Sequence, residues 1–242
     1  RVTGVRGDGF HLIDAEMVSL DLHDVLTITP GGNGIGVTGP FAGGVPTDQS
    51  NLVSRAMVML DANEAHVEID KQIPHGGGLG GGSTDAATVM RWAGMGTSDS
   101  DLARASHLGA DIAFCLVGGR ARVTGIGEIV EPLPYLDLTV TLVIPPLVVS
   151  TPAVYRAWDE RTNQSTDGPN DLEPAALAAE PRLQYWREAI GNRVSCKPTL
   201  AGSGATWFVD GEHQDALGDL LDEGATVVVA RTVPIEVAAP TE

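Results

Sequence analysis

The sequence predicts an α+β fold in two lobes, because two kinds of apolar periodicity are interleaved along it. Residues 66–73 alternate apolar and polar side chains as half-buried strands do, whereas residues 51–63 carry apolar side chains at helical spacing. No regular strand–helix–strand rhythm runs through the chain, so a fully parallel sheet is not expected. Pro145-Pro146 indicates a boundary between two domains. We therefore expect one lobe over residues 1–145 and a second over residues 146–242.

The same patterns place the other elements in chain order. Strands are expected over residues 17–30, 66–73, 121–130, 138–144, 205–209 and 225–231. Helices are expected over residues 51–63, 84–92, 99–107, 152–160, 174–190 and 212–222. Ser98 is the expected N-cap of the third helix. A loop rich in glycine and proline is expected over residues 30–47.

Charge and cysteine content exclude several classes of function. The chain has 32 acidic and 15 basic residues, a formal charge of −17. A surface this negative repels nucleic acids and anionic lipids, so neither is an expected partner. No apolar run approaches the roughly 18 residues of a membrane-spanning helix. Cys115 and Cys196 form no C-x-x-C pair, which argues against zinc and redox motifs and fits a reducing, cytoplasmic location.

The segment that points most clearly to a chemical function is a string rich in glycine. It runs Pro74-His75-Gly76-Gly77-Gly78-Leu79-Gly80-Gly81-Gly82-Ser83-Thr84-Asp85-Ala86-Ala87 and opens the helix expected from residue 84. Glycine lets backbone N–H groups approach a ligand closely, and a helix N-terminus adds free N–H groups and a positive dipole. The string therefore predicts an anion site. The hydroxyls of Ser83 and Thr84 could bind phosphate or Mg²⁺, or could cap the helix instead.

Three other interpretations of the string are weaker. Gly76, Gly78 and Gly81 match the dinucleotide pattern G-x-G-x-x-G, but the parallel units that this pattern requires are absent. No lysine follows in the position that the P-loop of nucleoside triphosphatases needs. A plain flexible linker would not need such a density of glycine, since each glycine costs folding entropy.

The string Pro-x-x-x-Gly-Leu-Gly-Gly-Gly-Ser closely resembles the phosphate loop of the GHMP kinases, among them galactokinase, homoserine kinase and mevalonate kinase. Four further segments resemble that family in the right order. They are Arg6-Gly7-Asp8-Gly9-Phe10-His11, then Leu108-Gly109-Ala110-Asp111-Ile112, then Ser150-Thr151-Pro152-Ala153-Val154-Tyr155 with Asn170-Asp171-Leu172 following, and last Leu200-Ala201-Gly202-Ser203-Gly204-Ala205. The resemblance spans nearly the whole chain, and it implies the two-lobed GHMP-kinase fold.

The resemblance also implies the site residues. ATP would lie on Gly76, Gly77, Gly78, Leu79, Gly80, Gly81, Gly82, Ser83 and Thr84, with Asn51 bordering the adenosine and Mg²⁺ neutralising charge. Asp111 would be the catalytic aspartate, and Phe10, His11, Thr151 and Tyr155 would form a cytidine pocket. The last of the four segments, residues 200–205, would support the nucleotide site. The C-terminal lobe would complete the substrate pocket.

Residue types alone suggest purely structural or solvent-exposed roles for several of these side chains. Asp111, Asn51 and Thr151 would be caps of helices or turns, and Lys71, which the resemblance places near the nucleotide, would be a solvated side chain. The sequence leaves the metal ligands and the oligomeric state open.

The resemblance implies phosphoryl transfer from ATP to the C2 hydroxyl of a cytidine-diphosphate-linked methylerythritol, in the non-mevalonate route to isoprenoids. Two alternatives stay open. Another GHMP small-molecule kinase would keep the glycine loop without a cytosine clamp, and a non-catalytic relative would bind nucleotide without turnover. The family carries a lysine and an asparagine on a first strand ahead of the position of Arg1. We expect such a strand to precede Arg1 in the complete gene product.

Overall fold

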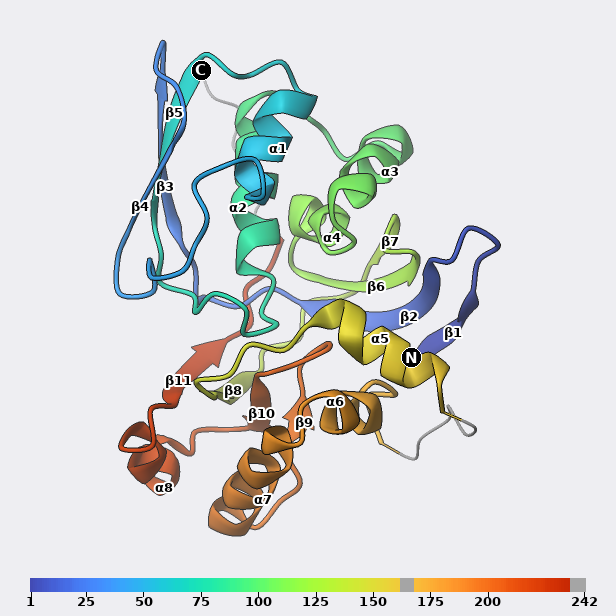
Figure 1. The fold of residues 1–242 in the computed structure, drawn as a ribbon, viewed down its shortest axis with the longest axis vertical. Helices are drawn as coiled ribbons and strands as arrows, with labels where there is room; N and C mark the ends of the chain where they lie inside the picture. Colours follow the sequence, from blue (N-terminus) through green and yellow to red (C-terminus); the bar gives the residue numbers. More distant parts are fainter. Residues whose placement is uncertain (162–167, 236–242) are drawn as a thin grey trace. The chain divides into compact units, whose positions relative to one another are not determined.

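A computed structural model describes residues 1–161 and 168–235, and it confirms the α+β fold class (Figure 1). The chain divides into two compact units. The N-terminal unit comprises Thr3–Ile73, Gly80–Asp137 and the residues from Thr232 onward, and the C-terminal unit comprises Arg1–Val2, Pro74–Leu79 and Leu138–Arg231. The lobes 1–145 and 146–242 stay a prediction. No helix within the described residues is long and apolar enough to cross a membrane.

The N-terminal unit holds two sheets and four helices. One sheet has the order β1 (Val2–Val5), β2 (His11–Val18), β6 (Arg120–Gly125), β7 (Ile129–Pro132), and the other has the order β3 (Val25–Pro30), β5 (Ala65–Asp70), β4 (Ile35–Thr38). The helices are α1 (Leu52–Met59), α2 (Gly81–Trp92), α3 (Asp99–Leu108) and α4 (Ile112–Val117).

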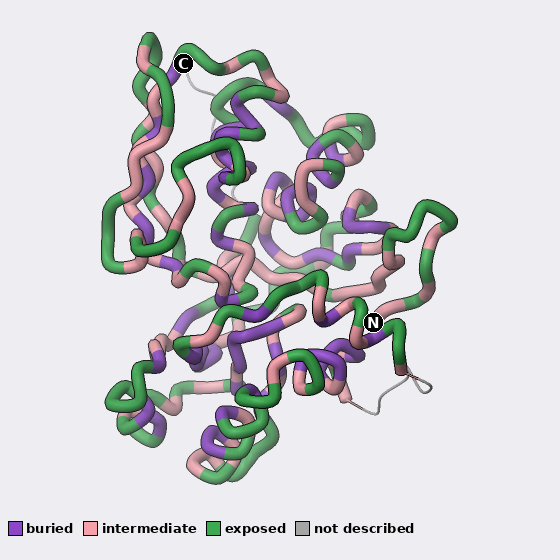
Figure 2. The backbone as a smooth tube through the Cα atoms, viewed as in Figure 1, coloured by how far each residue is buried: buried purple, intermediate pink, exposed green. Residues whose placement is uncertain are grey.

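Strand β5 shows how this unit is packed. Its residues alternate between buried and half-buried, as the period-two pattern predicts (Figure 2). The buried side chains Ala65, Val67 and Ile69 pack against α1 and α2 through Val53, Met57 and Val89. The two helices therefore lie on one face of the β3–β5–β4 sheet (Figure 1).

The C-terminal unit is a four-stranded sheet with helices. The strand order is β11 (Thr226–Arg231), β8 (Thr139–Ile144), β10 (Trp207–Asp210), β9 (Thr199–Leu200), and neighbouring strands are antiparallel. The helices are α5 (Thr151–Asp159), α6 (Glu173–Ala179), α7 (Arg182–Val194), α8 (Gln214–Leu217) and the 3₁₀ helix η1 (Gly218–Leu221). Trp207 and Leu183 are fully buried in the core of this unit.

Three expected elements are wrong in extent because the chain turns inside them. The strand expected over residues 17–30 is the end of β2, a connection and then β3. The strand expected over residues 121–130 is the hairpin β6–β7, whose turn contains Gly125 and Gly127 at positive φ. The helix expected over residues 174–190 is broken before Pro181, because the residue before a proline is driven out of the helical region.

The remaining differences are smaller. Strand β4 lies inside the loop expected over residues 30–47, where it pairs in parallel with β5. Helix α2 begins at Gly81, three residues before the expected start. The helix expected over residues 212–222 is the short α8 followed by η1. Ser98 caps α3 as predicted, accepting a hydrogen bond from the Asp101 N–H at 3.3 Å.

Candidate active site

The first half of the glycine loop is fastened to the turn that spans residues 200–206, within the C-terminal unit. The carbonyl of Gly77 accepts two hydrogen bonds from Thr206, one from its backbone N–H at 3.0 Å and one from its hydroxyl at 2.5 Å. Gly78 has φ +78°, and a Cβ there would lie 2.3 Å from the carbonyl oxygen of Gly204. Only glycine permits this approach. The turn therefore supports the loop.

The second half of the loop opens helix α2 in the N-terminal unit. Gly80, at φ +69°, occupies the N-cap position, and the first backbone bond of the helix runs from the Thr84 N–H to the Gly80 carbonyl at 2.9 Å. The N–H groups of Gly81, Gly82 and Ser83 precede that bond and have no intrahelical acceptor. Gly82 is exposed. This turn thus presents free N–H donors and the positive end of the helix dipole to solvent.

The two hydroxyls that follow do not cap the helix, so the capping interpretation is wrong for both. The Thr84 hydroxyl donates to the Gly80 carbonyl at 3.2 Å and lies 3.4 Å from Cys115 Sγ. The Ser83 hydroxyl has no hydrogen-bond partner among the described residues. Ser83 is therefore the hydroxyl free to meet an anion or a cation at this helix end.

Asp111 precedes α4 and makes no side-chain cap, so its expected role as a cap is wrong. No described residue forms a hydrogen bond or ion pair with its carboxylate, which is exposed at the surface. Surrounding protein nevertheless displaces enough water that desolvation raises the pKa of the Asp111 carboxyl. An exposed, unpaired carboxylate with a raised pKa is suited to accept a proton from an incoming hydroxyl.

The backbone before Asp111 is held by a second close approach. Gly127, at φ +112°, passes so near that a Cβ would lie 2.3 Å from the carbonyl oxygen of Ala110. The turn of the β6–β7 hairpin therefore packs directly against the peptide that precedes Asp111.

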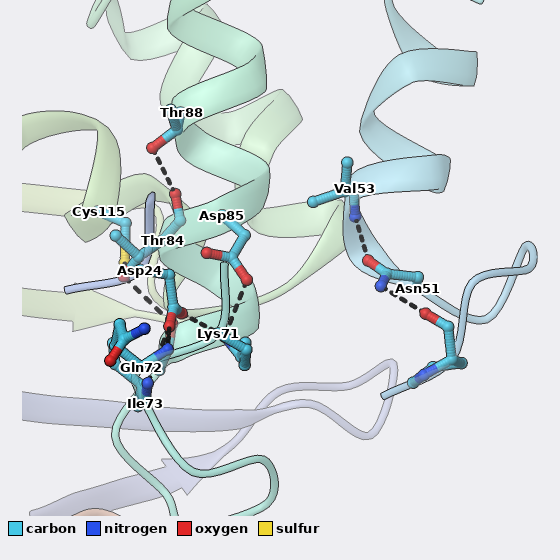
Figure 3. A network of polar contacts seen from close by, with 12 residues as sticks. Asp24, Asn51, Val53, Lys71, Gln72, Ile73, Thr84, Asp85, Thr88 and Cys115 are labelled. Carbon is cyan, nitrogen blue, oxygen red and sulfur yellow. Dashed lines mark hydrogen bonds and ion pairs between the residues drawn. The ribbon is translucent and has the colours of Figure 1, made fainter. Parts of the chain in front are cut away.

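Lys71 is buried below the first turn of α2, so the expectation of a solvated lysine is wrong. Its ammonium group forms ion pairs with Asp24 and with Asp85, the latter at 2.9 Å, and the side chains of all three residues are at most 5% exposed (Figure 3). A Cβ on Gly81 would lie 2.9 Å from Lys71 Nζ, so glycine at the start of α2 leaves room for the ammonium.

The carboxylates of Asp24 and Asp85, which share Lys71, differ in how many hydrogen bonds they accept. Asp24 also accepts hydrogen bonds from the backbone N–H groups of Gln72 at 2.6 Å and Ile73 at 2.8 Å. Asp85 Oδ1 is buried without a partner among the described residues. Desolvation raises the pKa of the Asp85 carboxyl to about 6, against the opposing pull of the Lys71 charge. Asp85 is therefore the less stabilised of the two carboxylates.

Asn51 is the N-cap of α1, which is the role that its residue type suggests. Its side-chain oxygen accepts from the Val53 N–H at 2.8 Å, and its amide nitrogen donates to the Pro46 carbonyl at 2.7 Å (Figure 3). The contact with adenosine stays a prediction.

The residues expected to bind cytidine are split between the two units. Phe10, 57% exposed, follows the β1–β2 turn, where the Arg6 guanidinium lies 5.6 Å from its ring centroid, and His11 begins β2. In the C-terminal unit Thr151 and Tyr155 lie one turn apart on α5, so they share a face of that helix. Their joint role as a pocket stays a prediction.

Thr151 is not the N-cap of α5; Ser150 is, accepting from the Ala153 N–H at 3.4 Å. The Thr151 hydroxyl lies 2.8 Å from the Ser203 hydroxyl, in the same turn that holds the glycine loop. Tyr155 packs partly against the core of its unit.

Sequence reasoning did not identify Asp24 and Asp85 as members of the site. The sequence did contain a clue to Asp85, because this residue lies within the glycine string, one turn into the helix that the string opens. Asp24 had none, since its partner Lys71 is 47 residues away in the chain.

Known proteins resemble this chain in sequence and in fold. Residues 51–119 match the sequence profile of the GHMP kinases N terminal domain. The chain is 39% identical over 226 residues to the 4-diphosphocytidyl-2-C-methyl-D-erythritol kinase of Paracoccus denitrificans, covering 86% of this chain and 81% of the relative. The kinase of the same name from Dinoroseobacter shibae is 39% identical over 228 residues, with coverages of 86% and 79%.

Solved structures extend the comparison. A crystal structure of 4-(cytidine 5'-diphospho)-2C-methyl-D-erythritol kinase matches with a TM-score of 0.74 and 28% identity, covering 96% of this chain and 94% of the other. A putative homoserine kinase from Listeria monocytogenes shares the fold, with a TM-score of 0.60, 16% identity and coverages of 93% and 92%.

Gly82→Ala tests the second half of the loop. Gly82 is exposed, its only neighbour is Leu52 Cδ1 at 3.9 Å from a built Cβ, and its φ is not positive, so alanine fits and should stabilise α2 by up to about 1 kcal/mol. If phosphate lies against the backbone of this turn, the added methyl group would hinder its close approach. We expect ATP affinity measured by calorimetry to fall at least about tenfold while the unfolding free energy holds or rises. Unchanged affinity would remove this turn from the site.

Asp111→Asn tests the unpaired carboxylate. The change keeps the shape of the side chain but removes its ability to accept a proton, so kcat should fall at least about 10²-fold. ATP affinity should hardly change, because the glycine loop is left intact. Near-normal turnover in steady-state kinetics would contradict the assignment.

Asp85→Asn tests the less stabilised carboxylate through pH. The folded state raises the pKa of Asp85 from 3.8 to about 6, so it binds the proton more tightly than the unfolded state does. Wild-type stability is therefore lost as pH rises through about 6, by about 1 kcal/mol between pH 5 and pH 7. The Asn variant should lack that loss in urea unfolding at both pH values. The exposed change Asp222→Asn is the control, and a wild-type slope retained in Asp85→Asn would refute the account.

Proposed function

The chain belongs to the 4-diphosphocytidyl-2-C-methyl-D-erythritol kinases of the GHMP superfamily, and from that premise we propose how its residues carry out the reaction. The enzyme transfers the γ-phosphoryl group of ATP to the C2 hydroxyl of its cytidyl substrate, a step of the non-mevalonate route to isoprenoids. The observation that carries the proposal is the glycine loop, which is fastened at Gly77 and Gly78 and opens into α2 with free N–H groups.

ATP binds with its phosphates on this loop. The backbone N–H groups at the start of α2 and the dipole of the helix stabilise the negative charge. This local field is independent of the net charge of −17, because the donors are fixed parts of the backbone. Asn51, at the start of α1, borders the adenosine.

A Mg²⁺ ion fits the donor set, although the described residues contain no cluster of three side chains that could hold a metal by themselves. Mg²⁺ in kinases is held largely by substrate phosphates and water, with one or two protein oxygens. The unpartnered Ser83 hydroxyl is the group that would bind it. When bound, the ion neutralises charge on the phosphates.

Asp111 serves the incoming hydroxyl. Its carboxylate has no competing partner among the described residues, and its raised pKa brings proton affinity closer to that needed at neutral pH. Phosphoryl transfer depends chiefly on positioning and electrostatics, so this step asks of the protein mainly a carboxylate placed beside the incoming hydroxyl.

The cytidyl group is recognised by Phe10, His11, Thr151 and Tyr155. The exposed ring of Phe10 and the ring of Tyr155 supply apolar faces on which a base stacks, while hydrogen bonds from His11 select cytosine. A cytoplasmic location fits this small-molecule chemistry and the two free cysteines.

The reaction is tested by ATP consumption with and without the cytidyl substrate, followed by phosphorus NMR of the product. Substrate-dependent ADP formation and a new phosphate monoester are expected. Turnover with a different alcohol alone would favour another GHMP kinase, and ATP binding without turnover would favour a non-catalytic relative.

Tyr155→Ala tests the cytidine pocket. Loss of base stacking should weaken binding of the cytidyl substrate by about 1–3 kcal/mol, because base–aromatic stacking is worth about that much. Tyr155→Phe keeps the ring and is the matched control, which also reports on packing of the ring against the core. Calorimetric Kd values for the cytidyl substrate and for ATP decide the outcome. Equal substrate affinity in the Ala variant would remove Tyr155 from the pocket.

A further inference from the structure

Asn170 lies outside the helices and strands of the C-terminal unit, yet its amide makes three hydrogen bonds. The side-chain oxygen accepts from the Leu172 N–H at 2.9 Å, just before α6. The side-chain nitrogen donates to the carbonyls of Leu200 at 2.9 Å and Gly202 at 2.7 Å. Both N–H bonds of the amide are therefore directed at one turn, 30 and 32 residues further along the chain.

That turn is the one that holds the glycine loop. It is closed by hydrogen bonds from the Gly204 N–H to the Ala201 carbonyl and from the Ala201 N–H to the Thr206 carbonyl, both at 2.9 Å. At the end of the turn, the backbone N–H and the hydroxyl of Thr206 donate hydrogen bonds to the Gly77 carbonyl. A continuous series of hydrogen bonds thus runs from the Asn170 amide through the turn to the loop, all within one compact unit.

The residue type at position 170 separates two roles. The bond to the Leu172 N–H needs only an acceptor, which aspartate supplies as well as asparagine. The two carbonyls need a donor group with two hydrogens, which aspartate lacks and a side-chain amide has. The side-chain NH2 group of Asn170, which aspartate lacks, is therefore the group that holds the turn.

We infer that Asn170 is a positioning residue for ATP binding, which acts through the turn at residues 200–206 to fix the path of Gly77 and Gly78. The inference rests on the proposed role of the glycine loop as the ATP site. Asn170 touches neither the loop nor ATP in this account. Its effect is to hold the support in the one arrangement that brings the Gly204 carbonyl against Gly78.

Asn170→Asp tests this inference. The variant keeps the acceptor for Leu172 but turns an oxygen toward two carbonyls, so the turn should shift. We expect the Kd for ATP from calorimetry to rise at least about fivefold, in line with the loss of two hydrogen bonds. The two carbonyl oxygens would repel the new carboxylate and raise its pKa, so the ratio of variant to wild-type Kd should fall as the pH is lowered from 7.5 to 5.5, because a protonated carboxyl can donate to one carbonyl again. A loss of stability alone would lower the unfolding free energy of the variant and leave the Kd of its folded form for ATP unchanged.

Asn192→Asp is the matched control, since it makes the same chemical change at an exposed position of α7 in the same unit. It should leave ATP affinity unchanged. If Asn170→Asp does not fold, Asn170→Ser retains an acceptor without the two donors and should show the same weakening of ATP binding. Wild-type ATP affinity in a folded Asn170→Asp or Asn170→Ser protein would overturn this inference but not the proposed function. Failure of the wild type to bind ATP overturns the proposed function, and this inference with it.

Discussion

The close approach of two backbone segments at Gly78 and Gly204 is the constraint on which the site depends. The Gly204 carbonyl occupies the space that any Cβ at Gly78 would need, and Thr206 binds the neighbouring Gly77 carbonyl twice. These contacts fix the loop before the chain turns at Gly80 into α2. The first half of the loop is therefore ordered within its own unit, and in the function that we propose this part of the loop need not lose conformational entropy when ATP binds.

Two kinds of carboxylate lie in the N-terminal unit near the glycine loop or the start of α4: Asp24 and Asp85 form ion pairs, and Asp111 has no partner among the described residues. Lys71 forms ion pairs with both Asp24 and Asp85 below the first turn of α2, where a buried charge without a partner would cost several kcal/mol. Asp111 has no described partner and faces solvent. Desolvation raises the pKa of both Asp85 and Asp111, but only Asp111 is open to a substrate. The ion pairs of Lys71 thus occupy the two buried carboxylates, whereas the Asp111 carboxylate stays available for the role of proton acceptor that we propose for it.

Local patterns predicted what depends on local physics. Strand β5, helix α3 with its Ser98 cap, and the run of glycines follow from periodicity and residue type, and the ordered motifs identified the family. Burial of Lys71 and the brace from Asn170 could not be predicted, because their partners lie 47 and 30 residues away in the chain. Strand β4 was missed for the same reason, since its pairing with β5 is a tertiary contact that overrides a glycine-rich composition.

Hydrogen–deuterium exchange of the wild-type protein, with and without ATP, tests the central claim that the glycine loop binds the phosphates. The backbone amides from Gly81 to Ser83 have no intrahelical acceptor, so they should exchange rapidly in the free protein and slowly when phosphate oxygens accept their hydrogens. The amide of Thr206, already bonded to Gly77, should be protected in both states. Protection by ATP confined to other segments, with residues 81–83 unchanged, would contradict the account.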